Sequence, residues 1–380
     1  MSVFKLAFPK INYSGVGAIE ALIERLSDEH SNEKGILICD PTLVDLGFAD
    51  QLLDSELDLV LFKDVRPNPD TNTVNTAYEM YCSSDAQYII GFGGGSSIDT
   101  AKAIKILSAN DGPIAIYNGV EKVRRLGAPM YAINTTAGTA AEVTSNAVIT
   151  DTDTHVKHVI ISDKIIPDIS VNDPSVMLGL PSSTTAATGI DALTHAVESF
   201  VSVGAHKLTD YISLEAITTI AQSLPLAVDD GSNVEAREMM AYGQFIAGLS
   251  FNNAGLGMVH AMAHPAGAHK DLPHGVCNAI LLPIVSEFNR PYCVEKFAQI
   301  AKALGTDTSN MTVEQASLAA IDGLNSLNRR VGIPEGFGQL GVTKTDIQNW
   351  VDDAMADPCA GGNPHPMSRE QIIELYESAL

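Results

Sequence analysis

The first half of this 380-residue sequence alternates short apolar runs with helical patterns, and this alternation limits the folds open to it. Several of the runs are apolar on both faces, which indicates strands buried between two layers of helices. Helical patterns of about 10 to 15 residues separate several of the runs, as in α/β domains with a parallel sheet. The expected strands cover residues 35–39, 59–62, 87–92, 130–134 and 156–161.

The sequence pattern changes near residue 180, after the turn-forming stretch 172–174. From Pro181 onward strand candidates almost disappear, and helical periodicity rich in Ala, Leu and Ile replaces them. The expected helices cover residues 184–201, 207–224, 234–249, 258–268, 292–303, 313–330 and 368–380. We therefore expect α/β plus all-α: an N-terminal Rossmann-like parallel-sheet domain at 1–180, followed by an all-helical domain at 181–380. No Gly/Ser linker separates the halves, so we expect them to pack directly with a cleft between them.

Charge and cysteine content exclude several classes of protein. Lys and Arg number 23 against 46 Asp and Glu, which gives a formal net charge of −23. Nucleic acid and anionic membranes are bound mainly by clustered basic residues, so neither is an expected partner. The five scattered cysteines form no Cys-x-x-Cys pair, which favours a reducing compartment. Because no signal peptide or run of about 18 apolar residues is found, we expect a cytoplasmic protein.

A glycine cluster directly follows the expected strand 87–92 and opens a helical run, in the sequence GFGGGSSIDTAK. Backbone amides at a helix N-terminus form an anion site suited to a pyrophosphate, and glycine lets the ligand approach closely. The cluster fits neither the standard dinucleotide fingerprint, because Ser96 stands where the third glycine should be, nor the Walker A motif. The other interpretation of these glycines is a tight turn that packs a helix against the sheet.

Two further features favour a dinucleotide. The segment 134–142 also follows an expected strand and offers three threonine hydroxyls and a glycine toward phosphate or ribose. Asp40 ends the strand 35–39, where a carboxylate can accept hydrogen bonds from ribose hydroxyls and would repel a 2′-phosphate, so NAD is favoured over NADP. A helix N-cap or turn before Pro41 is the alternative role for Asp40.

An aspartate and several histidines form a second candidate site. Asp191 and His195 are four residues apart, which places both on one face of an expected helix. A later segment holds four of the ten histidines of the chain: His260, His264, His269 and His274. Each spacing alone also fits an interaction on a helix surface, but carboxylate and imidazoles in apolar surroundings need partners and suit a cation such as Fe²⁺ or Zn²⁺. Spacing does not identify the ligands among the four histidines, although His269, in a polar patch, is the least expected one.

Over nearly its whole length the sequence resembles the iron-containing (group III) alcohol dehydrogenases. The resemblance lies in GGGSSIDTAKAI, INTTAGTAAEVT, GIDALTHAVE, GLGMVHAMAHPAGAHKDLPHGVCNAILLP and CAGGNPHPMSREQI, in the family's order. It implies a metal ion, with Fe²⁺ the first candidate and Zn²⁺ the second, held by Asp191, His195, His260 and His274. It further implies that His264 lies near the nicotinamide and takes part in proton transfer. Cofactor-contacting positions of the family are matched by Asn68, Gly94, Gly95, Ser96, Asp99, Thr135, Thr136, Thr139 and Lys157. The sequence departs from the family at Ala140-Ala141, where Gly-Ser is frequent.

From the residues and the resemblance we expect a metal-dependent, NAD(H)-linked alcohol dehydrogenase. It would interconvert small primary alcohols or diols and aldehydes by hydride transfer, as a homodimer or larger homo-oligomer. One alternative is a metal- and NAD-dependent lyase resembling dehydroquinate synthase, which would need several basic residues for its anionic substrate and is disfavoured by the net charge of −23. The other is a non-catalytic nucleotide-binding protein whose histidines are merely buried.

Overall fold

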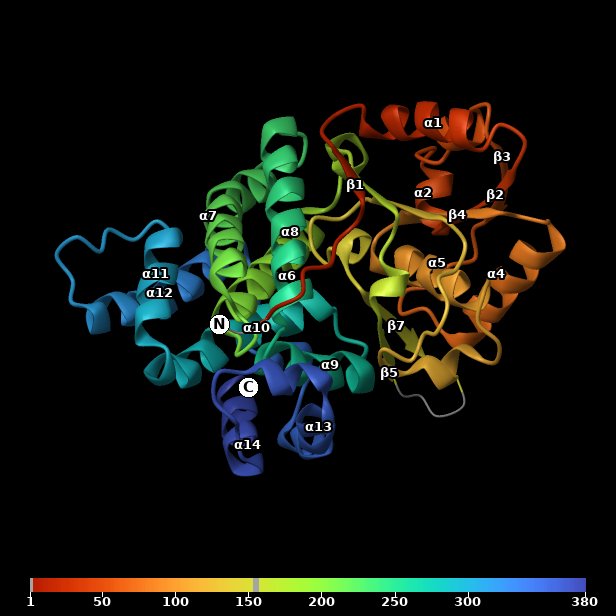
Figure 1. The fold of residues 1–380 in the computed structure, drawn as a ribbon. Coiled ribbons are helices and arrows are strands. Elements are labelled where there is room, and N and C mark those ends of the chain that lie inside the picture. The colour runs from red at the N-terminus through yellow and green to blue at the C-terminus, as the bar shows by residue number, and fades with distance from the viewer. Residues whose placement is uncertain (1–2, 153–156) are drawn as a thin grey trace. The chain divides into compact units, whose positions relative to one another are not determined.

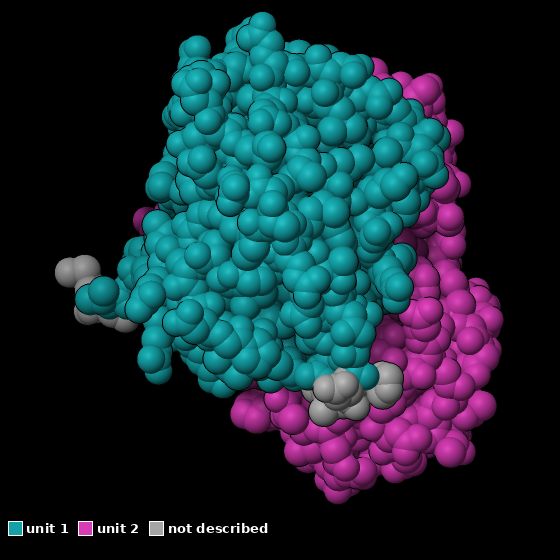
Figure 2. Space-filling model, turned by 90° about the vertical axis from the view of Figure 1, so that its right-hand side faces the viewer, with its two compact units in different colours: residues 1–136, 140–177 teal, residues 137–139, 178–380 magenta. Residues whose placement is uncertain are grey.

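The chain divides into two compact units, which Figure 2 colours separately. The computed structural model describes residues 3–152 and 157–380. One unit, here called the sheet unit, comprises Met1–Thr136 and Ala140–Met177, and the other, the helical unit, comprises Ala137–Thr139 and Leu178–Leu380. The predicted fold class is confirmed, because a six-stranded parallel sheet forms in the N-terminal part and helices make up the C-terminal part (Figure 1).

The sheet unit is built on a parallel sheet with the strand order β1-β9-β6-β4-β2-β3. A second, small sheet has the order β5-β8-β7. The strands are β1 (Ile11–Ser14), β2 (Lys34–Cys39), β3 (Asp58–Phe62), β4 (Tyr88–Gly93), β5 (Gly119–Val120), β6 (Met130–Asn134), β7 (Asn146–Thr150), β8 (Lys157–Ile161) and β9 (Ile169–Asn172). The helices are α1 (Ala18–Glu29), α2 (Pro41–Asp45), α3 (Asp50–Leu53), α4 (Thr71–Ser83) and α5 (Gly95–Leu107).

The run at 156–161, expected among the strands of the parallel sheet, belongs to the small sheet instead. There β8 pairs with β7 in antiparallel fashion. Residue 156 lies outside the described residues. Most residues of β8 are only partly buried, unlike those of β2 or β4, which agrees with a strand that is not covered on both faces.

The apolar runs of the sequence are explained by two hydrophobic cores on the two faces of the parallel sheet. On β2, Leu37 and Cys39 enter one core together with residues of α1, whereas Ile36 and Ile38 enter the other together with residues of α5. All four side chains are fully buried. Because successive side chains of a strand point to opposite faces, a sheet covered on both sides requires apolar residues at every position.

The strand order creates a switch point between β2 and β4. From β2 the chain moves outward to β3, and it then returns to the other side of β2 with β4 and continues to β6 and β9. In open parallel sheets, ligands bind outside the carboxyl ends of the strands at such a point. Asp40 directly follows β2 and Gly94 directly follows β4, so two of the predicted cofactor residues border the switch point.

The helical unit is arranged around one buried helix. Thr185 to Val201 of α6 are buried except for Thr188, and α6 packs against α7, α8 and α10. Gly189 permits the close packing of α7, since a Cβ there would lie 2.3 Å from a methyl carbon of Leu224. The two helices α10 and α13 were not predicted from the sequence.

The helical unit contains the following α-helices: α6 (Ser182–Val201), α7 (Lys207–Asp229), α8 (Val234–Ala254), α9 (Met258–Lys270), α10 (His274–Asn289), α11 (Val294–Ala303), α12 (Val313–Arg330), α13 (Lys344–Ala356) and α14 (Arg369–Ser378).

Helix α7 alone among the described helices has the length and composition of a membrane span. It packs against α6 and α8 within the helical unit. The core helices of globular proteins meet the same criteria of length and composition. We therefore interpret α7 as a core helix.

Gly91 on β4 allows α5 to lie close to the sheet, which is the packing role considered for these glycines. A Cβ at this position would lie 2.9 Å from Cβ of Ala101 and 3.4 Å from Cα of Ile98. We expect Gly91→Ala to lower the free energy of unfolding by about 1–3 kcal/mol, because the added methyl group overpacks the core. Urea denaturation measures this change. Gly361→Ala is the control, since a Cβ there meets nothing within 4 Å, and an equal loss in both variants would contradict the explanation.

Candidate functional site

Four side chains of the helical unit lie close together around Asp191. One ligand atom each of Asp191, His195 and His260 lie within 4.8 Å of one another. Oδ1 of Asp191 lies 3.7 Å from Nε2 of His260 and 3.5 Å from Nε2 of His274. The structure thus brings together the four residues expected to hold a metal.

Three helices supply this cluster. Asp191 and His195 lie one turn apart on α6, His260 lies on α9, and His274 is the first residue of α10. The ring of His195 stacks on Phe251 and on His260, with centroid distances of 4.2 and 4.6 Å. This stacking fixes the orientation of the imidazole.

The electrostatics of the cluster suit a cation. Burial raises the pKa of Asp191, but the neighbouring imidazoles outweigh this effect and hold it well below its usual range. Burial lowers the pKa of His195 to about 3, so its ring is neutral at pH 7. Desolvation also lowers the pKa of His274, an effect that solvent moderates because this side chain is 37% exposed. For His260, burial lowers the pKa, but the neighbouring carboxylates of Asp191 and Glu198 outweigh this effect and raise the pKa to about 9.

These residues fit a divalent first-row metal. One carboxylate and three imidazoles are the donor types that Fe²⁺ and Zn²⁺ accept.

Glu198 orients His260 and was not predicted from the sequence. Oε2 of Glu198 lies 2.6 Å from Nδ1 of His260, and Oε1 accepts a hydrogen bond of 2.7 Å from the backbone N–H of Val259. Because Nδ1 of His260 donates its proton in this hydrogen bond to Glu198, the other ring nitrogen, Nε2, faces Asp191. The sequence carried a signal for this role, since Glu198 is an acidic residue in the apolar run that follows His195.

His264 is held in a different way from His260, although both lie on α9. Nδ1 of His264 lies 2.7 Å from Oδ2 of Asp357, and Oδ1 of Asp357 accepts from the backbone N–H of Cys359 at 2.8 Å. The rings of His264 and His274 stack with a centroid distance of 5.3 Å. Asp357, which was also not predicted, therefore occupies Nδ1 of His264 and leaves Nε2 as the nitrogen open to another partner. Burial raises the pKa of the Cys359 thiol well above its usual value, so it is a poor metal ligand here.

The remaining clustered histidine, His269, lies on the surface. Its Nε2 is 2.8 Å from Oδ2 of the exposed Asp353. The sequence favoured this residue as the one that is not a ligand.

In the sheet unit, two loops meet at the carboxyl ends of β4 and β6. Gly94 is the N-cap of α5 and supplies no side chain, so the first backbone amides of that helix, at Gly95 and Ser96, are available to an anion. The backbone N–H of Thr135 donates to the carbonyl of Gly93 at 3.1 Å, and a Cβ at Gly94 would lie 3.4 Å from the side chain of Thr136. The two predicted cofactor loops are therefore neighbours.

The other predicted cofactor residues have structural partners. Asp40 is the N-cap of α2 and accepts from the backbone N–H of Leu43 at 3.1 Å, the alternative considered for it. Nζ of Lys157 donates to Oδ1 of Asn68 at 3.0 Å, so these two residues lie together.

Of the remaining predicted cofactor residues, Asp99 lies in the sheet unit and Thr139 in the helical unit. Oδ2 of Asp99 accepts from the backbone N–H of Val148 at 3.0 Å, and burial raises the pKa of Asp99 to about 6 against the effects of Lys102 and Lys157. Ala140, which follows Thr139, has φ 52°, a left-handed conformation that glycine adopts more readily than alanine.

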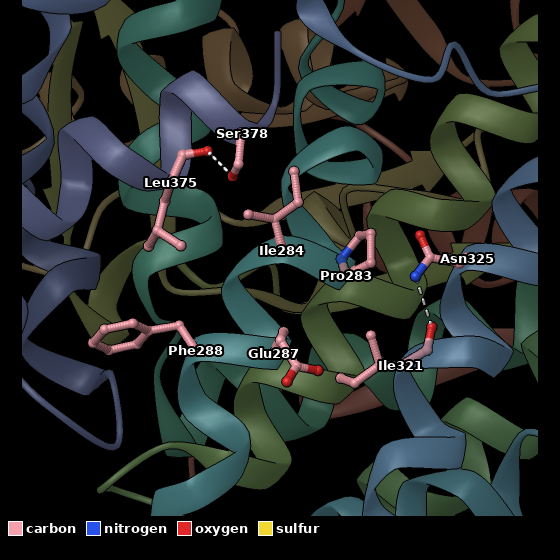
Figure 3. A pocket seen from close by; sticks show the side chains of 8 residues that line it. All are labelled: Pro283, Ile284, Glu287, Phe288, Ile321, Asn325, Leu375 and Ser378. Atoms are coloured by element: carbon pink, nitrogen blue, oxygen red, sulfur yellow. Dashed lines mark hydrogen bonds between the residues drawn. The ribbon is translucent and has the colours of Figure 1, made fainter.

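A groove of ≈ 460 Å³ lies elsewhere in the helical unit, between α10, α12 and α14 (Figure 3). Two of its polar side chains turn back to their own helices, since Asn325 donates to the carbonyl of Ile321 and Ser378 to that of Leu375. The groove is lined by Pro283, Ile284, Glu287, Phe288, Ile321, Asn325, Leu375 and Ser378. It contains none of the predicted site residues.

A helix N-terminus at the switch point of a parallel sheet and a buried carboxylate–imidazole cluster are features of metal-dependent, nucleotide-linked enzymes. Comparison with known proteins identifies the family within this class. The family model "iron-containing alcohol dehydrogenase" matches residues 9–174, and the model "Fe-containing alcohol dehydrogenase family, C-terminal" matches residues 185–380. The chain belongs to the iron-containing alcohol dehydrogenase family, whose members use NAD(H) and iron or another divalent metal.

Relatives of the chain match it along nearly its whole length. It is 40% identical to a 1,3-propanediol dehydrogenase of Citrobacter freundii, over 100% of this chain and 99% of that protein. It is 41% identical to the lactaldehyde reductase of Escherichia coli K12, over 96% of both chains. The crystal structure of a 1,3-propanediol oxidoreductase superposes with a TM-score of 0.97 at 39% identity, and covers 100% of both chains. The prediction of an NAD-linked, metal-containing alcohol dehydrogenase is thereby confirmed.

The contact between Glu198 and His260 yields a prediction about metal binding. In Glu198→Gln the amide cannot accept from both the imidazole and the backbone, so the orientation of His260 is lost. We expect the affinity for Zn²⁺ to fall about 10- to 100-fold, as for other partners of metal-binding histidines. Competition with a chelator measures the affinity, and the exposed Glu238→Gln serves as the control. An unchanged affinity in Glu198→Gln would refute the orienting role.

Proposed function

We propose that the protein interconverts small primary alcohols or diols and their aldehydes with NAD(H) and a divalent metal, Fe²⁺ being the first candidate and Zn²⁺ the second. The observation that carries this proposal is the convergence of Asp191 with three imidazoles in the helical unit. The names of the relatives, which refer to 1,3-propanediol, lactaldehyde and methanol, support a small alcohol or aldehyde as the substrate.

In this proposal Asp191, His195, His260 and His274 hold the metal. When bound, the metal supplies a Lewis acid for the oxygen of the alcohol or aldehyde, and the nicotinamide accepts or donates the hydride. His274 is the most exposed of the four side chains, which supports entry of the substrate on its side of the cluster. Glu198 pairs with Nδ1 of His260 and so keeps Nε2 of that ring directed toward Asp191.

His264 is proposed to move the proton. Asp357 holds Nδ1, so the other ring nitrogen can accept a proton from the alcohol, by way of a ribose hydroxyl or water, and can return it in the reverse direction. The stacking of His264 on His274 supports this role, because it keeps the ring beside the proposed metal ligands.

The sheet unit is proposed to bind the dinucleotide through the predicted residues. The amides of the α5 N-terminus and the loop after β6 would bind the pyrophosphate, and Asp40 would accept hydrogen bonds from the ribose. The residues proposed for these contacts are Asp40, Asn68, Gly94, Gly95, Ser96, Asp99, Thr135, Thr136, Thr139 and Lys157. The lyase and non-catalytic alternatives are not favoured, because the named relatives are dehydrogenases and reductases.

We also propose a reducing, cytoplasmic location. All five cysteines are free, and they include the exposed Cys82. Persistent free thiols are typical of reducing compartments.

The metal site is tested by removing single ligands. We expect His260→Ala and His274→Ala each to lose bound metal and alcohol-dependent NADH formation together, because three donors hold the ion more weakly than four. Metal content by atomic emission and NADH absorbance with 1-propanol, 1,3-propanediol or lactaldehyde measure the two effects. His269→Ala is the control, with full retention of both. Full activity of a metal-free His260→Ala protein would contradict the Lewis-acid role.

The choice between NAD and NADP is tested at Asp40. We expect Asp40→Gly to raise kcat/KM with NADP⁺ by about tenfold or more, because the carboxylate no longer repels the 2′-phosphate. Asp40→Ser retains an N-cap for α2 without the charge, so it separates the two roles of this residue. Should Asp40→Ser leave kcat/KM for NADP⁺ unchanged, another residue determines the preference.

A homodimer is proposed through the N-terminal region of the sheet unit. Strand β1 is an edge of the parallel sheet, and Val3, Phe4 and Phe8 before it are exposed. An open edge and exposed apolar side chains favour association with a second copy. We expect light scattering to give at least twice the 40.3 kDa of the chain, and Phe4→Ser with Phe8→Ser to shift the protein toward the monomer. A wild-type monomer at micromolar concentration would contradict this.

A further inference from the structure

Asn278 is a polar side chain within the carboxylate–imidazole cluster, and no site described above uses it. It lies on α10, one turn after His274, and is fully buried. Its Nδ2 lies 2.6 Å from Oδ1 of Asp191, 3.0 Å from Nε2 of His274 and 3.1 Å from Nε2 of His260. One amide nitrogen therefore faces three of the four atoms that are proposed to hold the metal.

The contact of this amide with His274 and a bound metal exclude each other. A neutral imidazole nitrogen has one lone pair in the ring plane. Nε2 of His274 therefore cannot accept a hydrogen bond from Asn278 and coordinate a cation at the same time. Binding of a metal at Nε2 of His274 must therefore displace the amide hydrogen.

The other end of the carboxamide is without a partner. Oδ1 of Asn278 is buried and has no hydrogen bond among the residues that the structure describes. Such a group costs about 1–3 kcal/mol when it stays unsatisfied. The NH₂ group, and not the carbonyl oxygen, is thus the end of the carboxamide that has partners in the cluster.

We propose that Asn278 is a placeholder for the metal, which stabilises the empty site by donating to its ligand atoms and turns its NH₂ group away when a cation binds. This inference rests on the metal site of the proposed function. The amide lowers the free energy of the empty site more than that of the loaded site, so it reduces the metal affinity while it keeps the buried ligands paired. An empty site would then hold its geometry until a metal arrives.

Two variants change the amide in different ways. Asn278→Leu keeps the volume and removes the donor. Asn278→Asp is nearly isosteric but places a second carboxylate beside Asp191, which destabilises the empty site and attracts a cation. The probe is Co²⁺, added to protein stripped with a chelator. The measurements are the dissociation constant from chelator competition and the melting temperatures of the stripped and the loaded protein.

We expect both variants to bind Co²⁺ about tenfold more tightly than the wild type or tighter still, with Asn278→Asp the tightest. The melting temperature should fall more in the stripped than in the loaded protein. Asn289→Leu is the matched control, because Asn289 is a buried asparagine of the same helix that pairs with Asn363. It should lower both melting temperatures equally and leave the dissociation constant unchanged.

Weaker binding in the variants, or a dissociation constant within twofold of the wild type, would overturn the placeholder role and leave the proposed function intact. If the wild type itself bound no Co²⁺, Zn²⁺ or Fe²⁺, the proposed function would fail and this inference with it. Asn278→Asp provides the answer on its own if Asn278→Leu does not fold.

Discussion

The burial of the Asp191 carboxylate among imidazoles is the constraint on which the helical unit depends. A charge removed from water needs an opposite charge or a complete set of hydrogen bonds, and the residues around Asp191 are arranged to meet this need. Glu198 of α6 binds the ring of His260, and Asn278 of α10 donates a hydrogen bond to the carboxylate of Asp191. The central position of α6, enclosed by α7, α8 and α10, keeps water away from the carboxylate.

Local patterns in the sequence predicted much of the fold. Continuous apolar runs predicted β2, β3, β4 and β6 within a residue or so, because each face of the sheet has its own core. The four-residue strands β1 and β9 are too short to show a pattern of their own. Helix α10 escaped prediction because its apolar residues are nearly continuous and Pro283 lies inside it, so helical periodicity is weak.

The site was only partly readable from the sequence. The spacing of Asp191 and His195 predicted their common helix face, but the choice of His274 among four histidines came from family resemblance. Partners distant in the sequence left no local signal: Glu198 and His260 are 62 residues apart, and His264 and Asp357 are 93 apart. Asp40 shows a further limit, because an N-cap and a ribose ligand require the same residue type at the end of a strand.

The proposed ligands come from three helices, and this has a consequence for how the protein ages. An ion held by α6, α9 and α10 would cross-link residues that are up to 83 positions apart in the chain, much as a disulfide bond does. Sequestering agents would then act as mild denaturants, and the half-life of a preparation on storage would follow the supply of trace metal in its buffer as much as the temperature.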